Sequence, residues 1–433
     1  MNVRTQSATA LGENTLIVRD AAKGLGRAIM KLEKPSSLMI VAKELDVNLD
    51  YFTRELTRHL LDLSFDCFGG KPIKVYVDKR FKTSPTFSYK EMLLKYPNYD
   101  KRLLFWDVDL CQQHPELIDC IITLGGDGTV LFTTWLFQKS QVPPVIPFHF
   151  GSLGFLTVFK TNEIESVLTR VLGCNSAGLR VNMRMRLSCT IWRTRNTDSI
   201  PTLNNGKSIY ILPVEDIKID DSDIGTKKSI LILEQENSLK SYPKETFQIL
   251  NDLVVDRGPS AYMSQLDLFV DDKPLTTVQA DGLVVSTPTG STAYSLAAGG
   301  SLAHPEVPSF LLTPICAHSL SFRPMLLPDS IELKIQVPYN SRNTAWASFD
   351  GRHRCELRQG DFIVVKLSRW PVPTVCSDDQ SSDWFESLRR CLHWNERTRQ
   401  LPFETEAKVV PGLDSVDQIP SLSVLAEDLF GDS

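Results

Sequence analysis

Four short runs in the first 150 residues are almost wholly apolar, and this feature limits the fold more than any other. Apolar runs of this length, without polar alternation, are typical of strands buried on both faces, as in a parallel sheet. Helical patterns at 130–137 and 162–172 lie between or after them. The chain is therefore predicted to begin with an α/β domain that has a Rossmann-like parallel sheet. The four runs are Ile73–Val77, Leu103–Val108, Leu117–Leu124 and Val145–Phe150.

The pattern changes after residue 172. Apolar and polar residues alternate at Leu179–Ile191 and at Ile331–Val337, and Phe362–Leu367 is a short apolar run. Alternation with a period of two, bounded by Gly, Pro, Asn and Asp, is typical of antiparallel strands with one buried face. Asp383–His393 has helical spacing instead. We therefore expect an all-β sandwich domain after the α/β domain, and then a helix.

These changes divide the chain into segments. A length of 433 residues is enough for two packed domains. We expect a flexible leader at 1–36, the α/β domain at 37–175 and the β-sandwich domain at 176–372, with a polar surface insertion at 195–228. A C-terminal helix at 373–400 is expected to return to the first domain, and 401–433 is expected to be an acidic, disordered tail.

Charge and cysteine content exclude several classes of protein. The formal net charge is −5, so the chain has no overall basic footprint for nucleic acid. No stretch approaches 18 uninterrupted apolar residues, so we expect no helix that crosses a membrane. Nine cysteines without a CxxC pair argue against a disulfide framework and against a zinc site. Acidic residues interrupt the leader, so we expect a cytoplasmic rather than a mitochondrial protein.

The third apolar run ends in a glycine cluster, Gly125-Gly126-Asp127-Gly128-Thr129, which precedes a helical pattern. At the carboxyl end of a strand, glycines and the free amides of a helix start form a site for phosphate. The cluster matches neither a Walker loop nor the GxGxxG fingerprint. A carboxylate in such a site is either a base for an attacking hydroxyl or a ligand of phosphate-bound Mg²⁺. The alternative is a tight turn in which Asp127 caps the helix.

Three further segments have the composition of a ligand site. Gly151–Leu156 (GSLGFL) follows the fourth run, and its glycines suit close approach to a ligand. Asn251 and Asp252 interrupt an apolar stretch and suit hydrogen bonds to a ribose or an amide, although such pairs are also common in turns. Asp281–Gly300 has the pattern of a strand, a Thr-Pro-Thr-Gly turn and a helix at about 291–300, which gives a second helix start for an anion or sugar.

In order and spacing, these four segments resemble the signature of the NAD kinase family, most closely its eukaryotic members. The resemblance spans about residues 70–370 and extends to Ser321–Pro324 and Ser348–Arg352. It implies an α/β domain that binds ATP, a β-sandwich that binds NAD, and an active site between them. The implied reaction moves the γ-phosphate of ATP to the 2′-hydroxyl of the adenosine ribose of NAD or NADH, with Mg²⁺ or another divalent cation carried by ATP. Members of this family are commonly homo-oligomers, and we expect the same here.

The resemblance also implies roles for single residues. Asp127 matches the proposed catalytic base and is the one expected protein contact of the cation, since no metal cage of protein ligands is expected. The family often has Asn-Glu where this chain has Asn-Asp at 251–252. The positions expected to hold the phosphates of ATP are Gly125, Gly126, Gly128 and Thr129; those expected to contact NAD are Phe155, Asn251, Asp252, Asp281, Thr292, Ala293 and Tyr294; and further candidates in family-like segments are Arg186, Arg257 and Asp350.

Two other functions fit part of this pattern. The GGDGT pentapeptide also resembles diacylglycerol and sphingosine kinases. A lipid kinase, however, is not expected to carry the segments at 251–252 and 287–294, and no hydrophobic lipid-docking run is evident. The other alternative is a regulatory protein that binds NAD(P) without turnover, and the presence of Asp127 argues against it.

Overall fold

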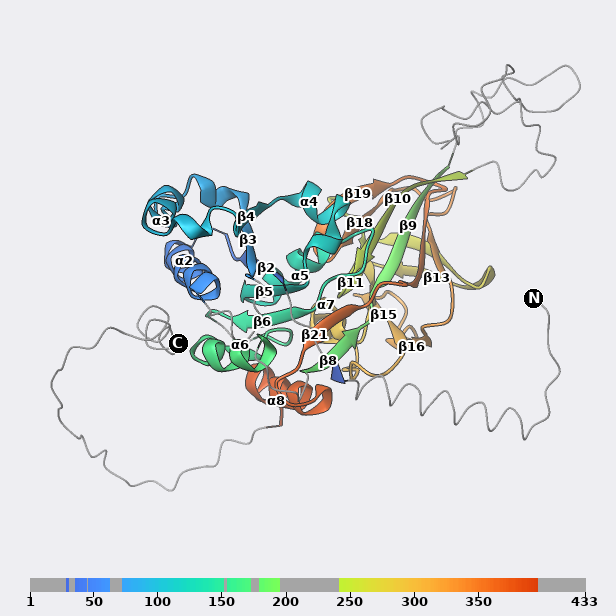
Figure 1. The fold of residues 1–433 in the computed structure, drawn as a ribbon. Coiled ribbons are helices and arrows are strands. Elements are labelled where there is room, and N and C mark those ends of the chain that lie inside the picture. Colours follow the sequence, from blue (N-terminus) through green and yellow to red (C-terminus); the bar gives the residue numbers. More distant parts are fainter. Residues whose placement is uncertain are drawn as a thin grey trace, which may run out of the picture.

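The computed structural model describes residues 29–30, 36–44, 46–62, 72–151, 154–172, 179–194 and 241–395. The expected insertion at 195–228 and the expected tail at 401–433 lie outside these ranges, and so does the expected leader apart from 29–30 and 36. In Figure 1, a sheet covered by helices lies beside a second body that consists mostly of strands.

The sheet of the first body has nine strands. In spatial order they are β1 (Ile29–Met30), β8 (Leu179–Arg184), β21 (Val372–Val375), β6 (Val145–His149), β5 (Cys120–Gly125), β2 (Ser37–Ala42), β3 (Lys74–Asp78) and β4 (Leu103–Trp106), with β7 (Phe159–Lys160) also paired to β6. The strands from β21 to β4 are parallel, whereas β8 is antiparallel to β21 and β1 is antiparallel to β8. The carboxyl ends of β2, β5 and β6 therefore meet at one edge.

Helices cover both faces of this sheet because its central strands are apolar on both sides. In β2, Leu38 and Ile40 belong to one hydrophobic cluster, and Met39 and Val41 belong to another. This arrangement confirms the parallel α/β sheet that the apolar runs predicted. The first face carries α2 (Val47–Asp62), α3 (Tyr89–Lys95) and α6 (Ile164–Leu172), and the second carries α4 (Val108–Gln113) and α5 (Asp127–Trp135). Single 3-10 turns are η2 (Lys79–Lys82), η3 (Pro97–Tyr99), η4 (Pro115–Leu117) and η5 (Thr161–Glu163). No helix in the described ranges is long and apolar enough to cross a membrane.

Two antiparallel sheets of six strands form the second body. Side chains from both sheets share one hydrophobic cluster, with Leu187 and Ile363 from the first sheet and Leu253 and Leu283 from the second. The expected β-sandwich is thus confirmed. The first sheet contains β10 (Ser241–Ile249), β9 (Leu187–Thr194), β20 (Phe362–Leu367), β17 (Leu333–Gln336), β12 (Ser264–Val270) and β13 (Lys273–Ala280), and the second contains β16 (Met325–Pro328), β15 (Ser309–Ile315), β14 (Gly282–Ser286), β11 (Asp252–Asp256), β18 (Ala345–Phe349) and β19 (Arg352–Leu357).

Two segments differ from the expectation. The alternating run 179–191 does not form one strand of the sandwich, because β8 joins the first sheet and β9 begins the second body at Leu187. The helix expected at about 291–300 is broken into the 3-10 turn η8 (Thr289–Thr292) and the single turn α7 (Tyr294–Ala297), because Ala293 has a non-helical ψ of −132°. The last described helix, α8 (Gln380–Leu392), lies next to α6 and β8 in Figure 1.

Candidate active site

The glycine cluster makes β5 pass directly into α5. Gly125 ends the strand, and Gly126 is the residue that precedes the first helical turn. A Cβ atom at Gly125 would collide with the hydroxyl of Thr129, so only glycine fits this sharp turn. The free amides at the start of the nine-residue helix α5 therefore lie at the carboxyl edge of the sheet, where an anion is favoured.

The carboxylate of Asp127 is held by the GSLGFL segment. Its oxygens accept hydrogen bonds from the amides of Phe155 at 2.8 Å and Leu156 at 2.9 Å, and from the hydroxyl of Thr157 at 3.3 Å. A Cβ atom at Gly154 would collide with the same carboxylate. Gly126, at the N-cap of α5, makes no side-chain capping bond, and the bonds of Asp127 go to another segment, so the helix-cap alternative is wrong. Ser152 and Leu153 of GSLGFL lie outside the described residues.

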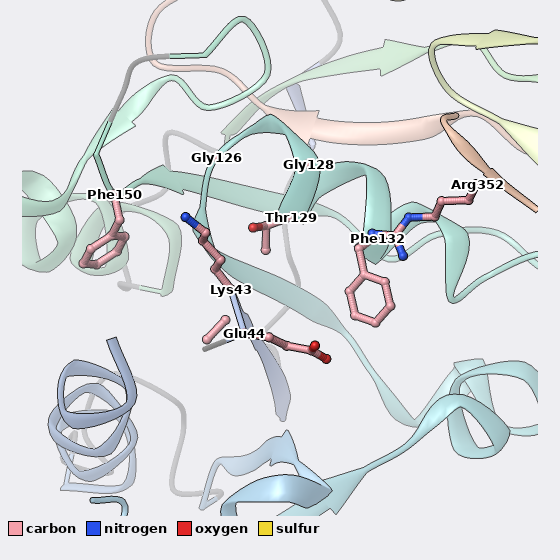
Figure 2. A pocket seen from close by; sticks show the side chains of 9 residues that line it. Lys43, Glu44, Gly126, Gly128, Thr129, Phe132, Phe150 and Arg352 are labelled. Carbon is pink, nitrogen blue, oxygen red and sulfur yellow. The ribbon is translucent and has the colours of Figure 1, made fainter. Parts of the chain in front are cut away.

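A cavity of about 470 Å³ opens over the glycine turn. Its polar groups include the side chains of Lys43 and Glu44, which follow β2, and of Arg352, which comes from β19. Figure 2 shows Lys43 extending toward the Gly126 turn and the Arg352 guanidinium next to the ring of Phe132. The lining residues are Ala42, Lys43, Glu44, Gly126, Gly128, Thr129, Phe132, Phe150 and Arg352.

The motifs did not reveal several of these lining residues. Lys43 and Glu44 directly follow β2, and β2 pairs with β5. The strand-end rule would have found them if the apolar run 38–42 had been counted as a strand of the sheet. Arg352 lies inside a family-like segment. Its place in the wall of this cavity could not be predicted, because it depends on how the second body packs against the first.

A second cluster forms where Asn251 and Asp252 connect β10 to β11. The enclosed carboxylate of Asp350 accepts hydrogen bonds from the amides of Leu250 and Asn251, both at 2.8 Å, and from that of Asp252 at 3.1 Å. Burial raises the pKa of Asp350, and the three amides oppose this effect. Asp350 and Gly351 form the tight turn between β18 and β19, with φ values of +48° and +69°. Asp350 therefore fixes the backbone of this connection.

Two buried side chains of this second cluster, Asp252 and Asn251, have polar groups that the surrounding residues do not fully satisfy. Asp252 is 6% exposed, and burial, followed by the charge of Asp350, raises its pKa to about 7, while a hydrogen bond from the backbone of Tyr294 lowers it. The side-chain oxygen of Asn251 is buried and has no hydrogen-bond partner among the described residues. The ring of Tyr294 is 45% exposed. A buried, unsatisfied oxygen beside a carboxyl group of shifted pKa is a marker of a ligand site.

The turn after β14 packs directly on Asn251. The backbone amide of Thr287 donates to the Asn251 carbonyl at 2.9 Å, and a Cβ atom at Gly290 would collide with that carbonyl. Thr292 uses its hydroxyl inside the turn, where it donates to the Thr289 carbonyl at 3.2 Å. The amide of Ala293 donates to the carbonyl of Gly290 at 3.0 Å. The structure thus brings Asn251, Asp252 and the segment 287–294 together.

A buried arginine, Arg184, contacts this turn from the first sheet. It lies on β8, is 7% exposed, and donates to the hydroxyls of Thr374 at 3.1 Å and Thr289 at 3.4 Å. Burial lowers its pKa, and the negative charge of Asp127 is among the groups that oppose this shift. The buried guanidinium of Arg184 is thus hydrogen-bonded to the turn at Thr289 and lies within electrostatic range of Asp127.

Asp281 and Arg257 lie away from both clusters. They form an ion pair of 3.2 Å at the opposite end of the β11–β14 pair from Asp252. Asp252 is opposite Ser286, and Asp256 is opposite Gly282, so about 13 Å of strand separates the two ends.

Arg186 also lies outside the clusters. It is wholly buried and donates to the carbonyl of Thr134 in the last turn of α5, to those of Phe137 and Ser140 after the helix, and to that of Trp370. Burial lowers its pKa to about 10. Its contacts hold α5 in place against the second body.

A cavity with glycine amides and cations at the strand ends of an open sheet defines a nucleotide-binding α/β protein. Comparison with known families narrows this class. The model of the ATP-NAD kinase N-terminal domain matches residues 38–175, and that of the ATP-NAD kinase C-terminal domain matches residues 250–376.

Relatives of known name agree with these matches. The ATP-NADH kinase YEF1 of Saccharomyces cerevisiae is 38% identical over 92% of this chain and 74% of its own length. The NAD(+) kinase of the same yeast is 40% identical over 89% of this chain and 64% of its own length. The crystal structure of yeast NADH kinase complexed with NADH is similar with a TM-score of 0.62 and 28% identity, over 86% of this chain and 91% of that one. The chain belongs to the NAD kinase family.

Proposed function

We propose that this chain is an ATP-dependent NAD kinase that phosphorylates the 2′-hydroxyl of the adenosine ribose of NAD and produces NADP and ADP. The placement of Asp127 is the observation that carries the proposal. Its carboxylate is fixed by the amides of Phe155 and Leu156, and its sequence neighbours Gly126 and Gly128 line the cavity, although Asp127 itself does not. Arg184, which donates to the turn that packs on Asn251, lies within electrostatic range of Asp127. Family membership supports the same reaction.

The donor side of the reaction is assigned to the cavity. The phosphates of ATP would lie on the amides of Gly126 and Gly128 at the start of α5, with the hydroxyl of Thr129 and the ammonium group of Lys43 beside them. No group of three metal-ligating side chains occurs in the described ranges. Mg²⁺ usually binds through phosphates and one or two carboxylates, and Glu44 at the cavity wall fits this pattern. When bound, the cation would neutralise charge on the phosphates.

The acceptor side is assigned to the second cluster. The unsatisfied oxygen of Asn251 and the carboxyl group of Asp252 would accept hydrogen bonds from the adenosine half of NAD, and the exposed ring of Tyr294 offers a stacking face. We also assign contacts with NAD in this region to Thr292, Ala293 and Phe155. NADH has the same adenosine half, so the same contacts accommodate both forms.

Asp127 is proposed to orient the 2′-hydroxyl and to accept its proton as the phosphoryl group arrives. A carboxylate offers about four acceptor positions. The two amides and the Thr157 hydroxyl occupy three, so one remains for the substrate hydroxyl. Because the amides fix the carboxylate, the base is positioned before the substrate binds.

We further propose that the enzyme uses Mg²⁺ or another divalent cation, that it forms a homo-oligomer, and that it is cytoplasmic. Size-exclusion chromatography with light scattering tests the assembly. Omission of divalent cations from the assay tests the first, because turnover should then be lost.

One assay separates the candidate functions. The purified chain is incubated with ATP and Mg²⁺ and, in parallel, with NAD, NADH, a diacylglycerol or sphingosine. NADP(H) is measured with a coupled dehydrogenase, phosphorylated lipid by thin-layer chromatography, and NAD binding by calorimetry. We expect NADP(H) from at least one nicotinamide acceptor and no phosphorylated lipid. Phosphorylated lipid alone would identify a lipid kinase, and NAD binding without turnover would identify a regulatory protein.

A further inference from the structure

The cavity over the glycine turn is built by both bodies of the molecule. The residues that follow β2, β5 and β6 supply most of its wall, but Arg352 is the first residue of β19 in the second body. It follows the tight turn in which Asp350 holds the Asn251–Asp252 connection. One turn of the sandwich therefore reaches both candidate subsites.

Among the described residues that line the cavity, positive charge exceeds negative charge. Neither Lys43 nor Arg352 forms an ion pair there, and Glu44 is the one acid among the lining residues. Arg354, two residues further along β19, is instead paired with Asp256 at 3.0 Å. The same strand thus carries one arginine that is already neutralised and one that faces the cavity.

The position of Arg352 suits a contact with the outer phosphates of a nucleotide. Its guanidinium carbon lies 5.2 Å from the centre of the Phe132 ring, and this contact holds the side chain against α5 (Figure 2). Phe132 and Gly128 are four residues apart in α5, so they occupy the same face of the helix, one turn from each other. A phosphate on the first turn of α5 would therefore lie on the helix face that also carries the ring against which this guanidinium packs.

We propose that Arg352 binds the β- and γ-phosphates of ATP, so that the sandwich completes the donor site of the α/β body. Guanidinium groups bind phosphate oxygens with two parallel N–H donors, which suits a polyphosphate. The inference rests on the function proposed above. It adds a phosphate-binding residue from outside the glycine motif. This residue directly follows the turn whose Asp350 also holds the backbone at Asn251 and Asp252, in the proposed NAD site.

Direct binding measurements test this contact. Calorimetry with Mg²⁺ compares AMP with the non-hydrolysable analogue adenosine 5′-(β,γ-imido)triphosphate, for the full chain and its variants. Arg352→Ala should weaken binding of the triphosphate about 10- to 100-fold, because a charge-assisted hydrogen bond is lost, and should change AMP binding less than about 3-fold. Arg352→Lys should fall between, and the KM for ATP should rise in parallel while the KM for NAD changes less.

Arg354→Ala is the matched control and should bind both nucleotides as the parent chain does. The denaturation midpoints of the unliganded variants should agree within about 2 °C, since Arg352 is exposed. An equal loss of AMP and triphosphate affinity, or no loss of either, would overturn the assignment. Absence of NADP formation by the parent chain would overturn the proposed reaction instead, and the comparison of the two nucleotides decides the role of Arg352 independently.

Discussion

The carboxyl group of Asp252 is buried away from solvent and is therefore only partly ionised at neutral pH. Burial and the nearby charge of Asp350 raise its pKa to about 7, and the hydrogen bond from the Tyr294 backbone lowers it only in part. Its unfolded value is about 3.9. The folded chain therefore keeps this proton at pH values where the unfolded chain has released it, and the contribution of Asp252 to stability falls as the pH rises from about 4 to 7.

Replacement of Asp252 by Asn tests this at the residue scale. The amide is neutral at every pH, so the denaturation midpoints of the two proteins should differ least near pH 4, where Asp252 is protonated in the folded chain and has only begun to ionise in the unfolded chain. At pH 8 the variant should melt higher than the parent by about 3 °C or more, because it avoids ionisation of a buried group. Thermal unfolding at both pH values gives the answer. A difference between the proteins that does not depend on pH, or that favours the parent at pH 8, would show that Asp252 is ionised without cost.

At the element scale, α5 is held at both ends by residues from other segments. At its first residue, Asp127 is hydrogen-bonded to the GSLGFL segment. At the other end, Arg186 donates to the carbonyl of Thr134 in the last turn and to that of Phe137 just after the helix. Arg186 also lies near Asp350, whose charge raises the pKa of the guanidinium against the larger effect of burial. The helix that carries the glycine motif is thus positioned by the second body.

Arg186→Leu should therefore destabilise the chain strongly. It leaves several buried carbonyls without donors and Asp350 without a nearby cation, and we expect the denaturation midpoint to fall by about 4 °C or more. Arg180→Leu is the control, because Arg180 is on the neighbouring strand β8 with an exposed side chain and a weak ion pair of 4.0 Å. Its midpoint should change by less than about 1 °C. Similar midpoints for both variants would mean that Arg186 does not support α5.

Elements dictated by local pattern were predictable from the sequence. The strand Phe362–Leu367 has the predicted bounds, and Val145–His149 differs from its prediction by one residue, since uninterrupted apolar runs mark buried strands. The change of sheet at Arg186 was not predictable, because β8 and β9 form one continuous alternating pattern and separate only through pairing with distant strands. Arg352 was not predictable as a cavity residue for the same reason, because tertiary packing brings it there, whereas Lys43 was missed because the run before it was not counted as a strand.

At the scale of the whole molecule, the first sheet depends on residues far along the chain. Its strands β8 and β21 come from residues 179–184 and 372–375, and β21 pairs directly with β6. Val372 and Leu250 also belong to the hydrophobic cluster that covers one face of this sheet. The sheet that carries the glycine motif is therefore completed by β8 and β21, which directly precede and follow the residues of the sandwich along the chain.

A fragment of residues 36–175 should consequently fail to fold cooperatively, whereas a chain of residues 36–395 should melt in a cooperative transition. The shorter fragment lacks β21, which pairs with β6 at Val145, so it exposes part of an apolar strand edge and part of a hydrophobic cluster. Thermal unfolding followed by circular dichroism distinguishes the two cases. A cooperative transition of the fragment, with protected amides in β6, would show that the sheet is independent of β8 and β21.

The most direct test of the account is the turnover number of Asp127→Asn in the NAD kinase assay, measured beside the parent chain with saturating ATP, Mg²⁺ and NAD. If Asp127 accepts the proton of the 2′-hydroxyl, kcat should fall about 10²- to 10⁴-fold, while the denaturation midpoint and the affinity for the triphosphate analogue stay close to those of the parent. A kcat near that of the parent would contradict the account, because the carboxylate held by Phe155 and Leu156 would then have no part in the chemistry.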